Sequence, residues 1–457
     1  MKMEIAGKRV LVVGLGKTGS ALVRFLSRRG AQVTVSEKKT EAELRRRAEY
    51  FREKGVRLEM GGHHLPTFLE ADIIVPSPGA ASIPELEAAK KAGVKIMPEI
   101  ELAHRFLRGR VIGITGTNGK STTATLAHKI LKEAGEKAYL SGNIGTPLIS
   151  FAEKSRDDHI YVTEISSFQL EHIDGFRVFM SVFLNVSQNH LDWHGSFEDY
   201  FNAKKKLVLA QAEDGIAILN RDDRLVWPLA RKVQATVYSF SAKRKVERGC
   251  YLERGWIVLA GQKETKLMKT SEIPLPGLHN QENVMAAALI GHCLGVPARL
   301  MRRSIRTFSG LEHRLEKVLS CGRVGYVNDS KATTVDATIK AIQSFDRKII
   351  LILGGRDKGA DFTLLRKPIR QKVKKVILVG EAREKIRKAL RGAVTMEEAS
   401  TLRQAVSLAS ASASPGEMVL LAPACTSFDM FKNFEARGRA FKKEVRRLTQ
   451  ALQRRKA

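Results

Sequence analysis

The sequence feature that most constrains the fold is a glycine-rich loop at residues 116–122, GTNGKST. An apolar strand pattern, RVIGIT, precedes it, and a helix pattern, TATLAHKILKEAG, follows it. Backbone amides in such a loop can surround phosphates, while Lys120 can reach the β- and γ-phosphate oxygens and Ser121 can bind Mg²⁺. Ile114 stands where the general phosphate-loop pattern has its first glycine. The loop predicts an ATP site whose candidate residues are Gly116, Thr117, Asn118, Gly119, Lys120, Ser121 and Thr122.

A second glycine motif, GxGxxG, lies at residues 14–19 between another strand pattern and helix pattern. Glu37 ends the next strand pattern, 18 residues after Gly19. Amides at a helix N-terminus bind a phosphate or pyrophosphate, and a carboxylate can accept hydrogen bonds from a sugar or base. Taken alone, the motif fits NAD(P), FAD, another nucleotide or only a tight turn. Ser77 and Gly79 close a later strand pattern, and we expect them to line the same crevice.

Strand and helix patterns alternate along the chain and begin afresh at GRVIGITG and at TFSGLEHR. A chain of 457 residues is long enough for about three domains. We therefore predict an α/β protein with an N-terminal Rossmann-like parallel sheet over residues 1–101. A central P-loop ATPase-type α/β domain is expected over 102–308, and a C-terminal Rossmann-like α/β domain over 309–457.

The chain is strongly basic, with 78 Lys and Arg against 48 Asp and Glu and a net charge of +30. Basic residues recur on nearly every predicted helix and aromatic residues make up only 6%, so we interpret most of the basic residues as solvated helix faces. We expect no nucleic-acid partner. At the C-terminus, Phe441, Val445, Leu448 and Leu452 recur at helical spacing, which predicts a helix docked by one face.

The apolar stretches, the N-terminus and the cysteines indicate the cellular compartment in which the protein works. No stretch approaches the roughly 20 apolar residues that span a bilayer, and no signal peptide precedes the first strand pattern. The four cysteines are scattered and have neither disulfide-framework nor zinc-site spacing. We expect a cytoplasmic monomer without a membrane span.

Short motifs in all three segments resemble the Mur ligases of peptidoglycan synthesis. Those that resemble the family as a whole lie between residues 116 and 314, and they are GTNGKST, GNIG from Gly142, EISSFQLE from Glu164, NVSQNHLD around His190, GLHNQEN around Asn280 and GLEHR ending at Arg314. Those of the third segment resemble the branch of the family that adds D-glutamate, and they are NDSKATT from Asn328, GGRDKGADF around Lys358 and PACTSFDMFKNFEARG around Ser427. All of them occur in the family's order.

The resemblance implies an ATP-driven amide-bond ligase that acts on UDP-N-acetylmuramoyl-L-alanine and D-glutamate. The carboxylate of the first substrate would take the γ-phosphoryl group of ATP, and the amine of D-glutamate would attack the resulting acyl phosphate. Because carboxylate and triphosphate are both anionic, positive charge and metal must neutralise their encounter. The resemblance places Lys120 at the phosphates. The metal ligands it implies are Ser121 and Glu164 for a first Mg²⁺, and His190 and a carbamylated Lys204 for a second.

Without the resemblance, these metal ligands have simpler interpretations. Glu164 could cap a helix, His190 could be an ordinary loop histidine, and Lys204 is one of three consecutive lysines on a basic helix.

The resemblance also implies the remaining ligand contacts. For ATP they are Asn280, Asn283, Arg314 and Asp329, with Lys331 near the phosphates and the intermediate. For the UDP-substrate they are Leu15, Lys17, Thr18, Glu37, Ser77, Gly79, Asn143 and Ser166. For D-glutamate they are Thr333, Lys358, Ser427, Phe428 and Phe434. Glu37 stands where the family often has aspartate, and Lys38 where a hydroxyl is common, which leaves the uracil contacts open.

The sequence alone leaves three other functions possible. A different Mur-type amino-acid ligase would share most motifs, although NDSKATT and the pair Ser427/Phe428 argue against it. A dehydrogenase would explain GxGxxG and Glu37, but two nucleotide loops in one chain count against it. A basic, ATP-dependent nucleic-acid-binding protein would rest on the net charge alone.

Overall fold

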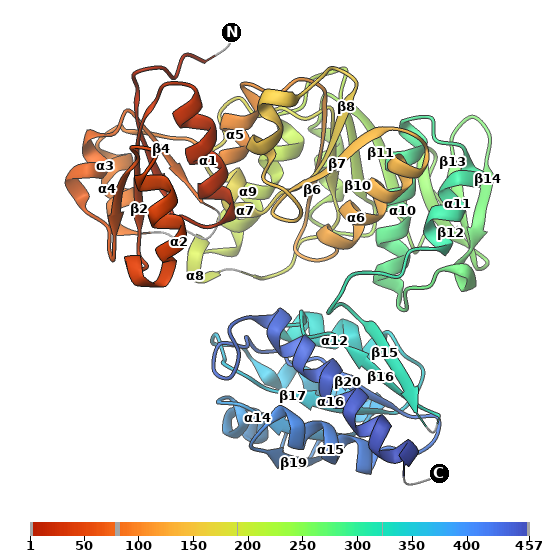
Figure 1. Ribbon diagram of the computed structural model, residues 1–457. Coiled ribbons are helices and arrows are strands. Elements are labelled where there is room, and N and C mark those ends of the chain that lie inside the picture. Colours follow the sequence, from red (N-terminus) through yellow and green to blue (C-terminus); the bar gives the residue numbers. More distant parts are fainter. Residues whose placement is uncertain (1–2, 78–82, 190, 322, 455–457) are drawn as a thin grey trace. The chain divides into compact units, whose positions relative to one another are not determined.

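The structure, a computed structural model, describes residues 3–77, 83–189, 191–321 and 323–454 (Figure 1). The chain divides into two compact units, of which the first comprises Met1–Thr270 and Glu282–Arg306 and the second Ser271–Gln281 and Thr307–Ala457. The first unit contains two β-sheets and the second contains one. The predicted class, α/β with three sheet-based domains, is confirmed, whereas the domain limits stay a prediction. Among the described residues, no helix combines the length and the apolar character needed to cross a bilayer.

The N-terminal sheet is parallel and has the strand order β3-β2-β1-β4-β5. Its strands are β1 (Arg9–Val13), β2 (Gln32–Glu37), β3 (Arg57–Met60), β4 (Ile73–Pro76) and β5 (Lys95–Ile96). Its helices are α1 (Lys17–Arg28), α2 (Glu41–Arg52), α3 (Leu65–Glu70) and α4 (Pro84–Lys91). Because side chains alternate along a strand, Val10 and Val12 pack with α1, whereas Leu11 packs with α3. The glycine loop and Glu37 therefore lie at the carboxyl ends of β1 and β2.

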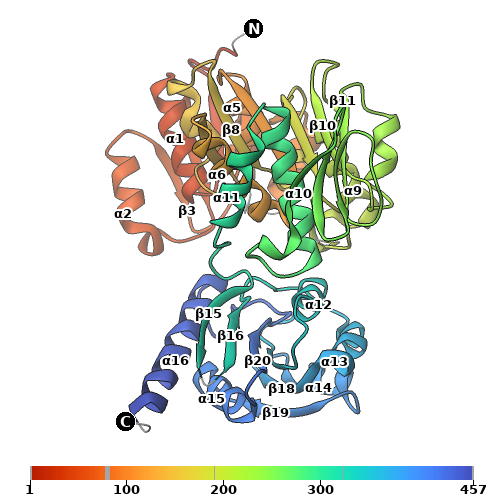
Figure 2. The ribbon, with the colours of Figure 1, turned by 90° about the vertical axis from the view of Figure 1, so that its right-hand side faces the viewer.

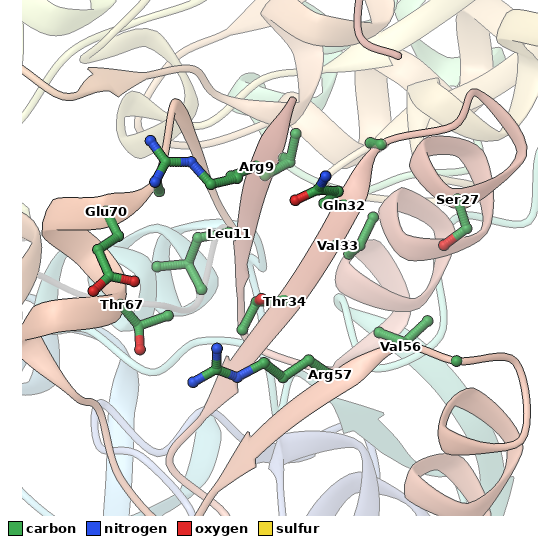
Figure 3. A pocket seen from close by; sticks show the side chains of 14 residues that line it. Arg9, Leu11, Ser27, Gln32, Val33, Thr34, Val56, Arg57, Thr67 and Glu70 are labelled. Atoms are coloured by element: carbon green, nitrogen blue, oxygen red, sulfur yellow. The ribbon is translucent and has the colours of Figure 1, made fainter. Parts of the chain in front are cut away.

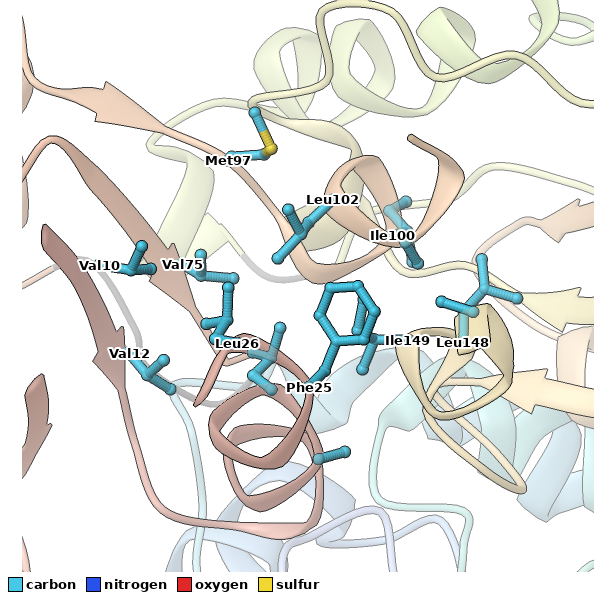
Figure 4. Packing of buried hydrophobic residues seen from close by; sticks show 14 of the residues in the cluster. Val10, Val12, Phe25, Leu26, Val75, Met97, Ile100, Leu102, Leu148 and Ile149 are labelled. Carbon is cyan, nitrogen blue, oxygen red and sulfur yellow. The ribbon is translucent and has the colours of Figure 1, made fainter. Parts of the chain in front are cut away.

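One hydrophobic core joins this sheet to the middle segment, as Figure 4 shows. Phe25 and Leu26 of α1 lie in the same cluster as Leu148 and Ile149 of a 3-10 helix, η1 (Leu148–Lys154). The connecting helix α5 (Glu99–His104) contributes Ile100 to the cluster. Residues of the N-terminal sheet and of the middle segment thus belong to one apolar core.

Two buried carboxyl groups of α5 form hydrogen bonds across this boundary. Glu99 accepts a hydrogen bond from the backbone amide of Ile149 at 2.7 Å. Glu101 accepts one from the amide of Gly175 at 3.1 Å and pairs with Arg105 at 2.7 Å. A buried carboxylate needs such partners, because it has lost its hydration.

The middle sheet has nine strands in the order β14-β13-β12-β11-β10-β9-β6-β8-β7. Its strands are β6 (Arg110–Thr115), β7 (Lys137–Gly142), β8 (His159–Glu164), β9 (Met180–Phe183), β10 (Ile216–Asn220), β11 (Thr236–Ser241), β12 (Gly249–Glu253), β13 (Trp256–Ala260) and β14 (Thr265–Lys269). The pairs from β7 to β12 are parallel, whereas β12, β13 and β14 pair antiparallel. Since β9, β6 and β8 are neighbours, the loops at their carboxyl ends lie side by side.

Helices surround this sheet. They are α6 (Lys120–Glu133), α7 (Ser167–Leu170), α8 (Leu191–His194), α9 (Phe197–Leu209), α10 (Leu278–Cys293) and α11 (Ala298–Arg306), with the 3-10 helices η2 (Trp227–Arg231) and η3 (Thr270–Glu272).

The sheet of the second unit has the order β15-β16-β20-β17-β18-β19, and only its β15–β16 pair is antiparallel. Its strands are β15 (Glu316–Cys321), β16 (Val324–Asn328), β17 (Ile349–Leu353), β18 (Val373–Val379), β19 (Thr395–Ala399) and β20 (Met418–Leu421). Its helices are α12 (Val335–Gln343), η4 (Phe362–Leu365), α13 (Arg366–Lys372), α14 (Arg383–Leu390), α15 (Leu402–Ser412) and α16 (Phe434–Arg454).

The helices of this unit cover both faces of its sheet. Figure 2 shows α15 and α16 on one side and α12, α13 and α14 on the other, which agrees with two separate apolar clusters. The predicted C-terminal helix docked by one face is confirmed, because Phe441 and Val445 of α16 are fully buried.

Candidate functional site

The glycine loop connects β6 to α6, as the sequence pattern predicted. Gly119 precedes the helix with φ of 86°, in the left-handed region. A Cβ atom there would lie 2.1 Å from Asn283 Oδ1, so a side chain at this position would collide with Asn283. Lys120 Nζ donates hydrogen bonds to the carbonyls of Gly116 and Thr117 at 2.8 and 2.9 Å. Lys120 is thus held against the loop whose bound phosphates it is predicted to contact.

Thr117 links this loop to α9. Its hydroxyl pairs with the Tyr200 hydroxyl at 3.0 Å and accepts a hydrogen bond from the Ser187 amide at 3.0 Å. Burial raises the pKa of Tyr200 to about 12, so the phenol stays protonated. Tyr200 was not among the predicted site residues, although an aromatic residue one helical turn before Lys204 is a signal that could have found it.

Three ionisable side chains, those of Lys120, Glu164 and Lys204, interact at the carboxyl ends of β6 and β8. Lys204 is 1% exposed and Glu164 is 3% exposed. Burial and the charge of Lys120 hold the pKa of Lys204 well below its usual range, while Glu164 acts in the opposite direction. The Lys204 nitrogen also lies 4.7 Å from the centre of the Tyr200 ring. This lowered pKa makes the unprotonated, nucleophilic form of the Lys204 amine more accessible than that of an ordinary lysine.

The neighbouring lysines differ from Lys204. Lys205 is half-buried and Lys206 is exposed, so Lys204 is the one of the three that faces the loop. This contrast supports the choice of Lys204 made from the sequence.

Asn143 lies beside the Glu164 carboxylate. Asn143 Nδ2 donates to Glu164 Oε1 at 3.1 Å, and the Asn143 amide donates to the Glu164 carbonyl at 2.9 Å. Ser166 caps α7 through reciprocal hydrogen bonds with Gln169. Ser121 lies buried in the first turn of α6. Hydroxyl and carboxylate oxygens of this kind are the ligands that Mg²⁺ prefers, so the described residues fit the predicted metal.

The first glycine loop is held by Glu37. Glu37 Oε2 accepts a hydrogen bond from the Leu15 amide at 2.6 Å, and Oε1 accepts one from the Lys39 amide at 3.0 Å. The Leu15 side chain is fully buried in the core. The structure thus pairs two predicted contacts of the UDP-substrate, Leu15 and Glu37, with each other.

Other residues predicted for the UDP-substrate lie around this loop. Lys17 donates to the carbonyl of Gly145, in the GNIG segment of the middle sheet. Ser77 Oγ donates to the carbonyl of Gly14 at 3.2 Å, and Thr18 is half-buried in the first turn of α1. Two predicted site residues, Gly79 and His190, lie outside the described residues.

The two asparagines predicted to lie near adenine are in the first turns of α10. Asn283 Oδ1 accepts a hydrogen bond from Thr123 Oγ1 at 3.3 Å, which places Asn283 against the phosphate loop. Asn280 Nδ2 donates to the carbonyl of Pro276 at 2.7 Å. Their contacts with adenine stay a prediction.

In the second unit, Asp329 and Lys331 follow β16 and lie near Arg314. Asp329 is buried, and this burial raises its pKa to about 7, although Arg314 acts in the opposite direction. Lys331 Nζ lies 4.0 Å from the centre of the Phe434 ring, and the Lys331 amide donates to the carbonyl of His313 at 3.1 Å. Arg314 and Asp329 therefore interact electrostatically, and the Lys331 ammonium lies against Phe434 in the same unit.

Four of the residues predicted for D-glutamate lie on loops after β16, β17 and β20, which are neighbours in the sheet, and the fifth, Phe434, begins α16. Ser427 is 2% exposed, whereas Phe428 is 59% exposed and Lys358 is also exposed. Thr333 and Phe434 are half-buried. The structure brings these loops to one edge of the sheet, and their contacts with D-glutamate stay a prediction.

Arg437 donates hydrogen bonds to two of these loops, those after β16 and β20. It was not among the predicted residues. It is 4% exposed and donates to Ser330 Oγ, Ser330 O and Cys425 O at 3.0 Å, and to Thr426 O at 3.1 Å. Burial lowers the pKa of Arg437 to about 10, so the guanidinium keeps its charge at neutral pH. The sequence carries a signal, since Arg437 lies one helical turn before Phe441, on the buried side of α16.

A cavity of about 390 Å³ lies near the amino ends of β1, β2 and β3, opposite the glycine loop (Figure 3). Two arginines line it, and each is already paired, Arg9 with Asp72 at 2.9 Å and Arg57 with Glu59 at 2.9 Å. We assign no ligand to this cavity.

One cluster of possible metal ligands among the described residues consists of Glu312, His313 and Glu316. Lys442 donates to both carboxylates. Its ammonium supplies the positive charge that a cation would bring, so we interpret the cluster as an ion-pair network.

The phosphate loop and the buried lysine and carboxylate beside it, at the carboxyl ends of parallel strands, define a nucleotide-dependent α/β enzyme. Three family models match successive parts of the chain: the MurD-like N-terminal domain of Mur ligases at residues 8–98, the Mur ligase middle domain at 114–291 and the glutamate ligase domain of Mur ligases at 313–425. The chain belongs to the Mur ligase family, as its motifs predicted.

Within this family, curated relatives match almost the whole chain. The UDP-N-acetylmuramoylalanine–D-glutamate ligase of Acidobacterium capsulatum is 47% identical over 444 residues, which cover 96% of each chain. The ligase of the same name from Koribacter versatilis is 45% identical over 450 residues, which cover 98% of this chain and 99% of the relative.

Solved structures of other ligases have a similar fold. A pseudomurein peptide ligase type C from Methanothermus fervidus has a TM-score of 0.61 at 19% identity, covering 97% of this chain and 100% of that one. A UDP-N-acetylmuramate-alanine ligase from Thermotoga maritima has a TM-score of 0.61 at 18% identity, covering 96% of this chain and 99% of that one. At this identity the likeness concerns the fold alone.

Proposed function

We infer that this chain catalyses the ATP-dependent addition of D-glutamate to UDP-N-acetylmuramoyl-L-alanine in peptidoglycan precursor synthesis. The observation that carries this inference is the identity of 47% to a ligase of that activity over nearly the full length of both chains. The phosphate loop with Lys120 above it supplies the site that such a use of ATP requires.

The reaction forms an amide from a carboxylate, which is a poor electrophile. A carboxylate oxygen of the UDP-substrate attacks the γ-phosphorus while the bond to ADP breaks, which gives an acyl phosphate. The unprotonated amine of D-glutamate then attacks the carbonyl carbon, phosphate leaves and the nitrogen loses a proton. Lys120 lowers the repulsion between the two anionic partners in the first step, because its ammonium already lies over the loop.

Magnesium fits the oxygen donors near Lys120, and when bound it neutralises phosphate charge. Ser121 and Glu164 would hold a first Mg²⁺, whereas His190 and a carbamylated Lys204 would hold a second. Two lysines beside one carboxylate repel a cation. Reaction of the unprotonated Lys204 amine with CO₂ gives a carbamate and releases a proton, so an anionic oxygen ligand stands where a protonated lysine would repel the metal, and the lowered pKa of Lys204 favours the amine form that reacts.

The other substrates have separate sites in this proposal. Lys17, Thr18 and Ser77 hold the uridine diphosphate, and Asn143 and Ser166 orient the muramoyl-alanine end. Thr333, Lys358 and Ser427 bind the two carboxylates of D-glutamate, because hydroxyl and ammonium donors can fix their spacing. We further propose that the enzyme works in the cytoplasm as a monomer.

A coupled assay of phosphate release tests the proposal. The purified chain is supplied with ATP, Mg²⁺ and UDP-N-acetylmuramoyl-L-alanine, and with D-glutamate, L-glutamate, lysine or diaminopimelate as the amino acid. We expect release with D-glutamate and a product larger by one glutamyl residue. Equal release with another amino acid would contradict the proposed specificity, and a saturable nicotinamide-dependent reaction would favour a dehydrogenase.

A further inference from the structure

Asp357 makes two contacts that fix the loop carrying Lys358. This loop follows β17, and Asp357 directly precedes Lys358 in it. Asp357 Oδ1 accepts a hydrogen bond from the Ala360 amide at 2.9 Å and so closes a turn around Lys358 and Gly359. The other oxygen, Oδ2, accepts a hydrogen bond from Lys385 Nζ on α14. One carboxylate thus closes the turn and attaches it to a helix.

The conformation and the charge of this turn are both well defined. Gly359 has φ of 80°, in the left-handed region that residues with a side chain rarely adopt. Burial by itself raises the pKa of Asp357, but the Lys385 ammonium and the Ala360 amide lower it, and the resulting pKa is below the usual range. Asp357 is therefore ionised at neutral pH and stays paired with Lys385.

The start of the same loop is joined to two other loops. The Arg356 amide donates to the Thr426 carbonyl at 3.1 Å and the Thr426 amide to the Arg356 carbonyl at 3.0 Å, which joins it to the loop that carries Ser427. The Arg356 guanidinium also pairs with the Glu381 carboxylate at 2.9 and 3.0 Å, shortly before α14. The loop is consequently held on both sides of the peptide bond between Arg356 and Asp357.

The way in which this backbone is held decides where the ammonium of Lys358 lies. A lysine side chain is long and flexible, so its ammonium is placed reproducibly only if its backbone is fixed. The two carboxylates of D-glutamate have a set spacing, and a shift of about 1 Å in one donor is enough to weaken a positioned contact strongly.

We propose that Asp357 is a positioning residue for D-glutamate, which together with Lys385 holds the turn that places the Lys358 ammonium at a carboxylate of this substrate. Asp357 acts through Lys358 and touches no substrate. The proposal rests on the D-glutamate site of the proposed function.

The test compares Asp357→Ala with Glu417→Ala. Glu417 is a matched control, because its Oε2 accepts hydrogen bonds from the Ser414 amide at 2.7 Å and from Lys374 Nζ at 2.9 Å. It precedes β20 and so lies at the opposite end of the parallel strands from the loop after β17. We expect Asp357→Ala to raise the KM for D-glutamate at least about tenfold and to leave the KM for ATP within about twofold. Glu417→Ala should lower the melting temperature without this selective change.

A double-mutant cycle tests the pair with Lys385. Lys385→Met removes the ammonium and keeps an unbranched side chain, and we expect it to raise the KM for D-glutamate by about threefold. In Asp357→Ala the same substitution should change this KM little, because the partner is already absent. Fully additive effects would show that Lys385 does not act through Asp357 and would overturn the proposal.

A binding measurement does not depend on turnover. Titration calorimetry compares UDP-N-acetylmuramoyl-L-alanine with the same compound extended by D-glutamate. Asp357→Ala should weaken binding of the extended compound at least about fivefold and leave binding of the shorter one within about twofold.

Three results would overturn the proposal: an unchanged KM for D-glutamate in Asp357→Ala, an equal rise in the KM of every substrate, or no greater loss of affinity for the extended compound than for the shorter one. A wild-type chain that binds both compounds but releases no phosphate would contradict the proposed function, and the two affinities would still decide the role of Asp357.

Discussion

Lys204 illustrates how burial changes the chemistry of a residue type. In the sequence it is one of three adjacent lysines, and only the resemblance to the family distinguished it. In the structure it is 1% exposed and faces a second cation, Lys120, so the pKa of its amine lies well below the usual range. Water stabilises an ammonium ion, and its removal favours the neutral amine, which is the form that reacts with CO₂.

We predict that Lys204→Arg removes nearly all ligase activity, because a guanidinium stays protonated and forms no carbamate. Activity is measured by phosphate release, and folding by circular dichroism. Lys205→Arg is the matched control and should keep most of the activity, since Lys205 is half-buried and its ammonium lies against the Phe201 ring, 5.8 Å from the ring centre.

The carbamate itself can be detected. Wild-type protein supplied with ¹³C-bicarbonate should give a carbamate carbon signal that is absent in Lys204→Arg. A folded and fully active Lys204→Arg enzyme would exclude Lys204 from the site.

At the scale of elements, α16 is held to its sheet by more than its apolar face. Arg437 donates hydrogen bonds to backbone carbonyls of two loops, those after β16 and β20. We predict that Arg437→Leu destabilises the second unit by about 3–5 kcal/mol, because it removes the guanidinium that donates to the buried carbonyls of Ser330 and Cys425. Urea unfolding measures the change.

Arg446→Leu, at an exposed position of the same helix, is the control and should change the free energy of unfolding by less than about 0.5 kcal/mol. A similar loss of stability in both variants would refute this role of Arg437.

The helix α5 carries a second element-scale prediction. Burial raises the pKa of Glu99 from 4.5 to about 7. Between these two values the folded state binds more protons than the unfolded state, so Glu99 lowers stability as pH rises from about 4.5 to 7. Glu99→Gln removes this ionisation, and we expect the variant to be more stable than the wild type at pH 8 by about 1–3 kcal/mol.

The difference between Glu99→Gln and the wild type should shrink as pH falls toward 4.5, because both side chains are then uncharged. Thermal unfolding followed from pH 4.5 to 8 measures it. Glu213→Gln, which alters an exposed carboxylate, serves as the control and should show no such dependence. A constant difference across this range would show that Glu99 does not ionise as expected.

At the scale of the whole molecule, the chain forms two compact units, and each contains its own apolar clusters. Because cooperativity depends on shared buried contacts, we predict two transitions in calorimetric unfolding. Arg437→Leu should lower the temperature of one transition, and hydrogen exchange should assign it to the second unit. A single transition that shifts as a whole in Arg437→Leu would contradict this prediction.

Sequence reasoning succeeded where a short segment contains its own signal. The alternation of strand and helix patterns predicted the α/β class, and the segment around Gly119 and Lys120 predicted a strand, a tight loop and a helix. Such patterns are local, since the period of apolar residues and the backbone freedom of glycine depend on the residue itself and its near neighbours. The roles of Tyr200 and Arg437 were missed, because Tyr200 contacts Thr117 and Arg437 contacts Ser330, which are far away in the chain.

The sequence by itself determined the class of fold, the phosphate loop and the family. Only the tertiary structure decided that Leu15 and Glu37 are hydrogen-bonded to each other, that Lys204 is buried and interacts with Lys120, and that Tyr200 is hydrogen-bonded to Thr117 of the loop. The physical reason is that hydrogen bonding and desolvation depend on distance in space. The parallel order β9-β6-β8 brings separate loops to one edge of the sheet, and no local pattern of residues specifies which of their side chains then meet.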